Sequence, residues 1–149
     1  MSKKRYRVGV YLLDNQRKRV LLYKAAEGPT AGQFGPLLSK LTTRESPMET
    51  VRNLIAEMTN LDFEFIGHSH AMPAVLDQDC VRLYPPFHLE LTHYNQENDF
   101  VDFVYLAQAK ASPDFPKQGP LFWFGSKDLD KVPLRVRSVV NHILALTGE

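Results

Sequence analysis

The sequence predicts an α/β fold, and three features of the chain support this prediction. Two segments, 47–59 and 133–147, repeat apolar residues at the three- and four-residue spacing of helices. Several other segments are short runs of β-branched, aromatic and apolar residues bounded by turn residues, as strands are. The 149 residues suffice for one domain with a sizeable core and are too few for two ordinary domains. We therefore expect one domain over residues 1–149.

Composition and charge place the chain among ordinary globular proteins. Hydrophobic residues make up 44% and charged residues 23%, and no apolar run approaches the length of a membrane span. The net charge of +1 gives no signal for a nucleic-acid partner. The basic N-terminus leads into a strand pattern without the apolar core of a signal peptide, so we expect a cytoplasmic protein with no membrane partner. Cys80 is the only cysteine, which excludes an intrachain disulfide.

The first third of the chain predicts a hairpin followed by a loop. Residues 6–13 alternate well enough for a strand, residues 14–16 supply a turn, and residues 20–24 form the return strand. The segment 27–32 is rich in the residues that interrupt regular structure, so it predicts a loop.

The helix predicted over residues 47–59 has both ends marked in the sequence. Ser46 is a good N-cap, Pro47 suits the first helical position, and Glu49 can close a capping box. Asn60 is a suitable left-handed residue at the C-terminal end. One apolar stripe runs along this helix and contains Met48, Val51, Leu54, Ile55 and Met58.

The second half of the chain predicts further strands and a closing helix. The strand candidates are 63–70, 87–92, 100–107 and 121–124, and the polar turn 94–99 joins the middle two. Pro133 opens the last helix, which Gly148 can end.

Residues 39–61 resemble the signature of the Nudix hydrolases, which reads Gly-x5-Glu-x7-Arg-Glu-U-x-Glu-Glu-x-Gly-U with U a bulky aliphatic residue. Four positions fit this pattern, namely Glu45, Ile55, Glu57 and Leu61. Five positions depart from it: Ser39 and Asn60 replace glycines, Asn53 replaces the arginine, and Leu54 and Met58 replace glutamates. The run 101–105 is similar to a core strand of the family, and the order of elements agrees over residues 6–146. The resemblance implies a Nudix-type α/β/α sandwich with a mixed β-sheet between the two helices.

Two of the five departures fall on residues that hold metal in the family. There, glutamates at the positions of Leu54, Glu57 and Met58 bind a divalent metal ion against a diphosphate. Mg²⁺ takes hard oxygen ligands, whereas leucine offers no ligand and methionine offers a soft sulfur. Leu54 and Met58 either extend the apolar stripe into packing surface or line an open cleft. In addition, Leu37 and Leu38 stand where the family has glycines that let backbone approach the diphosphate.

Two residues remain as catalytic candidates by resemblance. Glu57 is the candidate for both a catalytic role and a metal contact, and Glu45 is the second catalytic candidate. The alternative for Glu57 is a solvated helix glutamate, and the charge of Glu45 also suits the helix dipole. Asn53 in place of arginine removes the cation expected near Glu45.

Two functions of different classes are therefore open. The first is a hydrolase of nucleoside diphosphate-linked substrates, which would use Mg²⁺ or Mn²⁺ and which the degenerate signature predicts to be weak or inactive. The second is a non-catalytic Nudix-like module that binds a nucleotide-like small molecule or acts in regulation. The sequence does not decide the oligomeric state, and a homodimer is one of the states open to it.

Other polar and aromatic residues are weaker candidates. Carboxylates outside the signature could complete a metal site if the fold brings them together, and these are Glu90, Asp99 and Asp102. His68 and His70 have a spacing that two imidazole metal ligands can use on a strand, although hydrogen-bonded strand histidines are the commoner alternative. Several aromatic residues could stack on a base or complete the core, namely Phe34, Tyr84, Phe87, Tyr94 and Trp123.

Overall fold

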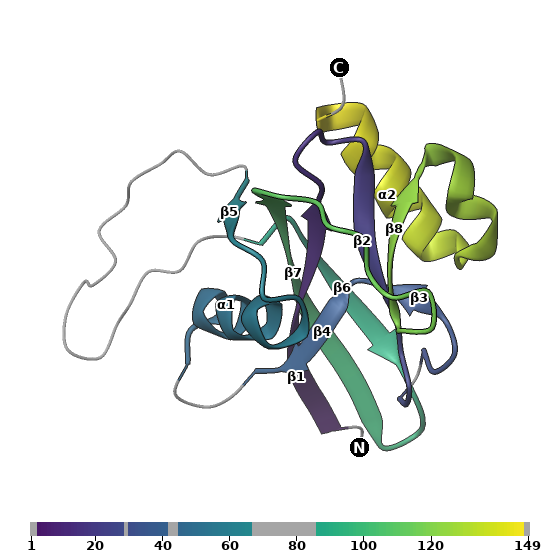
Figure 1. Ribbon diagram of the computed structural model, residues 1–149. Helices are drawn as coiled ribbons and strands as arrows, with labels where there is room; N and C mark the ends of the chain where they lie inside the picture. The colour runs from purple at the N-terminus through teal and green to yellow at the C-terminus, as the bar shows by residue number, and fades with distance from the viewer. Residues whose placement is uncertain (1–2, 29, 42–44, 67–85, 148–149) are drawn as a thin grey trace.

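The computed structural model describes residues 3–28, 30–41, 45–66 and 86–147. Within these residues, eight strands form one mixed sheet that lies between two α-helices (Figure 1). This arrangement confirms the predicted α/β/α sandwich. The strands are β1 (Lys3–Leu13), β2 (Arg19–Lys24), β3 (Phe34–Gly35), β4 (Leu37–Lys40), β5 (Phe63–Phe65), β6 (His88–His93), β7 (Asn98–Ala109) and β8 (Leu121–Gly125). The helices are α1 (Pro47–Met58), the 3₁₀ helix η1 (Ser126–Lys131) and α2 (Leu134–Thr147).

The long strands β1 and β7 form the centre of the sheet. They run parallel along their whole length, from Lys3 opposite Asn98 to Leu13 opposite Gln108. The inner part of the order is β3-β2-β1-β7-β5, while β4 also pairs with β1, β6 with β7 and β8 with β2. All these other pairings are antiparallel, so β1 and β7 supply the parallel part of a mixed sheet.

Each face of the sheet is covered by one helix. Because side chains alternate along a strand, Val8 and Val10 of β1 face α1, whereas Tyr11 and Leu13 face α2. The α1-side core also contains Val51, Leu54 and Ile55 of α1, and the α2-side core contains Val136, Val140 and Ile143 of α2. Burial on both faces explains why β1 and β7 have nearly continuous apolar runs. None of the helices in the described residues is long and apolar enough to cross a membrane.

The ends of α1 follow the predicted capping pattern. Ser46 is the N-cap, and its side chain accepts a hydrogen bond from the backbone N–H of Glu49. Asn60 has a φ of 56°, the left-handed conformation that follows many helix ends. The helix ends at Met58, one residue earlier than predicted, and α2 begins at Leu134, one residue after the predicted start.

Two short strands were missed by the sequence patterns. β3 and β4 contain too few residues to show a period, and they form because β3 pairs with β2 and β4 pairs with β1. In the β1–β4 pair, Gly9 lies opposite Leu38, and a Cβ at Gly9 would lie 2.8 Å from Cδ2 of Leu38. Of the strand predicted at 63–70, the structure shows β5, which ends at Phe65, and residues 67–70 lie outside the described residues.

Candidate ligand-binding site

The face of α1 that would carry metal-binding glutamates in the resemblance is packing surface. Leu54 is only 7% exposed and belongs to the α1-side core. Met58 is half-buried and packs against the same core, whereas Glu57 is exposed. Two of the three positions therefore serve packing in this chain.

The contact between positions 45 and 53 persists with different chemistry. The side-chain amide of Asn53 donates a hydrogen bond from Nδ2 to Oε2 of Glu45. An amide thus takes the place that an arginine would hold, and Glu45 keeps a fixed position beside the start of α1. We regard this contact as structural support for the segment that leads into the helix.

The described side chains do not form the cluster of carboxylates that the Nudix signature places around a divalent metal ion. Within residues 3–28, 30–41, 45–66 and 86–147, no group of three His, Cys, Asp or Glu side chains could hold a metal ion. Of the three signature positions on α1, only Glu57 offers a carboxylate, because Leu54 has no ligand atom and Met58 offers sulfur. The described residues therefore do not supply the three-glutamate Mg²⁺ or Mn²⁺ site that the Nudix resemblance implies.

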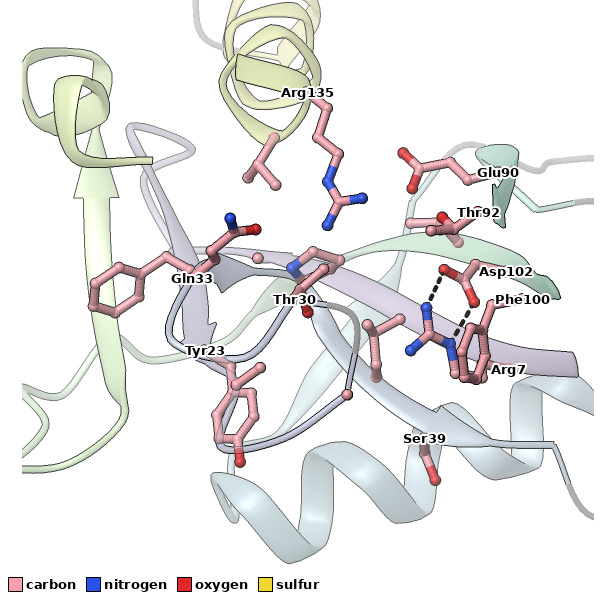
Figure 2. Close-up of a pocket in the computed structure, with 18 of the residues that line it drawn as sticks. Arg7, Tyr23, Thr30, Gln33, Ser39, Glu90, Thr92, Phe100, Asp102 and Arg135 are labelled. Carbon is pink, nitrogen blue, oxygen red and sulfur yellow. Dashed lines mark hydrogen bonds and ion pairs between the residues drawn. The ribbon is translucent and has the colours of Figure 1, made fainter. Parts of the chain in front are cut away.

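A cavity of about 370 Å³ opens on the α2 side of the sheet (Figure 2). Strands β1, β6 and β7, the segment from Ala25 to Lys40, and the first turn of α2 supply its walls. The sequence candidates Glu90 and Asp102 both line it, since they lie directly opposite each other on β6 and β7. Glu57 and Glu45 are not among its lining residues. Asp99 lies opposite His93, and its Oδ1 is 2.8 Å from Nδ1 of that histidine. Asp99 does not line the cavity.

An arginine–aspartate pair forms one wall of the cavity. Arg7 Nε and Nη2 donate to the two carboxylate oxygens of Asp102 at 2.7 and 2.8 Å, and the two side chains are only 13% and 5% exposed. The Arg7 guanidinium also lies 4.1 Å from the centre of the Phe100 ring. A bidentate pair stacked on an aromatic ring is held rigidly, so this wall is preorganised.

Glu90 lies on the same wall and is held in its ionised form. His88 Nε2 lies 3.0 Å from Oε1 of Glu90. This hydrogen bond is the main cause that lowers the pKa of Glu90, and the charges of His88, Arg135 and Arg7 act in the same direction against the effect of burial. A carboxylate in this state only accepts hydrogen bonds.

Tyr11 and Arg135 complete this end of the cavity. Tyr11 is 1% exposed, and burial, together with the charge of Glu90, raises the pKa of its hydroxyl, so the hydroxyl stays protonated. Arg135 is exposed and extends from the first turn of α2 into the cavity (Figure 2). Tyr11, Glu90 and Arg135 thus reach the cavity from β1, β6 and α2, which are far apart in the sequence.

Sequence reasoning missed Arg7, Tyr11 and Arg135. Arg135 carried a usable signal, because a cation in the first turn of a helix opposes the helix dipole and so calls for a reason. The pairing of Arg7 with Asp102 had no local signal, because 95 residues separate the partners.

The aromatic candidates divide between core and cavity. Phe34 lines the cavity but packs its ring against Phe122 and Phe124. Phe87 packs against the α2-side core, and Trp123 packs against the α1-side core while its indole N–H donates to the carbonyl of Pro113. Tyr94 is 47% exposed beside Phe100. The candidates His68, His70 and Tyr84 lie outside the described residues, as does Cys80.

Solved structures share this fold, although no protein-family model and no curated protein matches the chain. A NUDIX family hydrolase from Clostridium perfringens has a TM-score of 0.71 and 21% sequence identity, with 97% of this chain and 98% of that chain covered. A MutT NUDIX hydrolase from Burkholderia pseudomallei has a TM-score of 0.59 and 21% sequence identity, with 94% of this chain and 98% of that chain covered. The NUDIX domain of Shewanella oneidensis NrtR, complexed with ADP ribose, has a TM-score of 0.56 and 16% sequence identity, with 98% of this chain and 88% of that chain covered. These similarities confirm the predicted Nudix-type fold.

Proposed function

We propose that this protein binds a nucleoside diphosphate-linked small molecule in the cavity and hydrolyses it weakly or not at all. The observation that carries this proposal is the burial of Leu54, at the position where the resemblance places a metal-binding glutamate. Without that carboxylate, α1 lacks the donors for a metal ion that would activate water and neutralise a leaving phosphate. The fold itself suggests nucleoside diphosphate-linked substrates.

The cavity supports the binding half of the proposal. Its volume of about 370 Å³ lies in the range of small-molecule sites. Its lining combines the apolar side chains Phe100, Val104 and Val136 with the charged side chains Glu90 and Arg135. In one solved structure with this fold, the NUDIX domain of NrtR, the ligand is ADP ribose. A nucleotide-like ligand is therefore our choice for this chain.

A second candidate is hydrolysis with Mg²⁺ or Mn²⁺. One observation favours it: Glu57 is exposed on α1, and Glu45 is held in place by Asn53. A Mg²⁺ site can operate with one or two carboxylates when substrate phosphates and water supply the other ligands. In that candidate Glu57 binds the metal ion and Glu45 is its catalytic companion.

One experiment separates the two candidates. The protein is incubated with ADP-ribose, ADP and related nucleoside diphosphate derivatives, with and without Mg²⁺ or Mn²⁺, and both binding and the release of phosphate or nucleotide are measured. The proposal predicts saturable binding by calorimetry without metal, and little release. Turnover of about 1 per second or more, lost in Glu57→Gln, would instead establish the hydrolase. The proposal would be overturned if none of these nucleotides bound.

A further inference from the structure

Three polar groups at one end of the cavity have capacity that the described residues do not satisfy. They are the hydroxyl of Tyr11, one carboxylate oxygen of Glu90 and the guanidinium of Arg135. Each reaches the cavity from a different element, namely β1, β6 and α2. Such a convergence of unpaired groups indicates what a ligand must offer.

The Tyr11 hydroxyl is the most telling of the three. The Tyr11 side chain is 1% exposed and lines the cavity, yet its hydroxyl has no hydrogen-bond partner among the described residues. Among the described residues, Arg137 Nε is the buried side-chain polar atom without a hydrogen-bond partner, so the Tyr11 hydroxyl, which makes no hydrogen bond either, is open to the cavity. A ligand in the cavity would supply the missing partner. As a hydroxyl, Tyr11 both donates and accepts.

Glu90 requires hydrogen-bond donors from a ligand. His88 occupies Oε1, which fixes the orientation of the carboxylate, while Oε2 has no partner among the described residues. Figure 2 shows this carboxylate directed across the cavity toward Arg135. An ionised carboxylate can accept hydrogen bonds from two adjacent hydroxyl groups at once.

Arg135 is free to bind an anion. Its guanidinium has no ion pair and no side-chain hydrogen bond in the part of the chain that the structure describes. Guanidinium groups bind phosphate through paired N–H donors, and its position at the N-terminus of α2 adds the positive end of a helix dipole. The end of the cavity thus combines one anion receptor with a nearby acceptor of hydroxyl or amino protons.

The aromatic rings around this end favour a sugar over a nucleobase. A base would need a free ring face for stacking. The Arg7 guanidinium covers the Phe100 ring, Phe34 packs against Phe122 and Phe124, and Tyr23 packs against the α1-side core. The strands around Glu90 instead line the cavity with the polar side chains Thr92, Asp102 and Tyr11. Hydroxyl groups suit this lining better than a flat ring.

We propose that Tyr11, Glu90 and Arg135 form a subsite for a phosphorylated sugar, with the vicinal hydroxyls on Glu90 and Tyr11 and the phosphate on Arg135. This inference rests on the proposed function only in making the sugar phosphate part of a nucleoside diphosphate-linked ligand. The ligand must therefore carry a vicinal diol near its phosphate. A ligand that lacks one of the two hydroxyls should bind measurably less well.

Three probes, which lose first one sugar hydroxyl and then the whole sugar, test the subsite directly. Binding of ribose 5-phosphate, 2-deoxyribose 5-phosphate and inorganic phosphate is measured by calorimetry, with chemical-shift titration for millimolar Kd values. We expect ribose 5-phosphate to bind about tenfold or more tightly than its 2-deoxy form, as one lost hydrogen bond to a charged group implies. Glu90→Gln should remove most of that difference. Arg135→Gln should weaken both sugar phosphates equally.

Matched variants outside the cavity serve as controls. Glu64→Gln changes a strand glutamate near Lys110, and Arg52→Gln changes an exposed arginine on α1. Neither residue lines the cavity, and neither change should alter the Kd of ribose 5-phosphate. Tyr11→Phe should weaken ribose 5-phosphate binding while the protein stays folded.

The results that would overturn the subsite differ from those that would overturn the proposed function. Equal Kd values for the two sugar phosphates, or a discrimination that survives Glu90→Gln, would refute the subsite, as would binding of 2′-deoxyguanosine monophosphate that exceeds that of ribose 5-phosphate. If sugar phosphates fail to bind while ADP-ribose binds, the subsite is wrong and the proposed function stands. If ribose 5-phosphate binds with the expected discrimination while every nucleotide fails, the subsite stands and the proposed function is wrong.

Discussion

Replacing Leu54 by alanine tests whether α1 has exchanged metal binding for packing. The substitution removes three carbon atoms from a side chain that is 7% exposed. At about 0.8 kcal/mol for each buried carbon, the transfer term is roughly 2.4 kcal/mol. Incomplete collapse of the space left behind adds to this, so we expect a loss of about 3 kcal/mol, inside the usual range of ~2 to 5 kcal/mol.

Urea denaturation followed by circular dichroism measures this loss, provided that the m value stays unchanged. A loss of that size should also lower Tm by roughly 6 to 12 °C for a chain of this length. Glu57→Ala, on the exposed side of the same helix, is the matched control and should change the free energy of unfolding by about 0.5 kcal/mol or less. A loss below about 1 kcal/mol for Leu54→Ala would mean that Leu54 lines an open cleft, contrary to our reasoning.

The double substitution Leu54→Glu with Met58→Glu extends this test to metal. It places two carboxylates next to Glu57 on a face that is now packed, so the variant should unfold unless a divalent ion is present. Thermal melts with and without Mg²⁺ on both proteins decide the matter. A strong Mg²⁺-dependent rise in Tm for the natural chain, with no larger rise for the variant, would show that a metal site is built from other carboxylates.

Four further predictions concern the cavity. Asp102→Ala leaves Arg7 buried without its partner and should cost about 3 kcal/mol in urea denaturation, and a loss below ~1 kcal/mol would show that the pair is not structural. Tyr11→Phe removes a hydroxyl that makes no hydrogen bond within the described residues, so the free energy of unfolding should stay equal or rise by up to ~1 kcal/mol, and a clear fall would reveal a partner in the protein. Arg135→Gln removes a cation that opposes the dipole of α2 and also removes its attraction to Glu90, so these effects oppose each other and the free energy of unfolding should change by no more than about 0.5 kcal/mol; a loss above ~1 kcal/mol would show that the attraction to Glu90 dominates. Glu90 faces His88, Arg135, Arg7, Tyr11 and Asp102, and its pKa lies below the ordinary 4.5. Its ionised form therefore stabilises the fold above that pH, and this contribution is lost as the pH falls through the lowered pKa. Glu90→Gln should flatten the acid limb of a stability–pH curve, and identical curves for the two proteins would contradict the pair with His88.

Local signals explain which parts of the fold the sequence predicts well. Ser46, Pro47 and Asn60 mark the ends of α1 within a few residues of one another, so their chemistry is readable without knowledge of the rest of the chain. The strands β1 and β7 are long enough to show their composition. β3 and β4 are too short for this, and their formation depends on neighbours in the sheet.

The cavity was largely beyond sequence reasoning for a related reason. Glu90 and Asp102 were recognised as free-standing carboxylates, but only the pairing of β6 with β7 places them opposite each other. Arg7 reaches Asp102 through the parallel register of β1 and β7, which no local pattern specifies. Asn53 carries no cation to Glu45, but its side-chain amide donates a hydrogen bond to that carboxylate, a contact that the sequence did not predict.

Gly9 influences the shape of the cavity although it does not line it. The residue does not line the cavity, but Leu38 does, and any side chain at position 9 would press on Leu38 and move it. Substitutions at these two positions should therefore be correlated among related lineages, with a small residue at one wherever the other is large. An alanine at position 9 would displace the side chain of Leu38, so the shape of the cavity can change through a residue that does not line it.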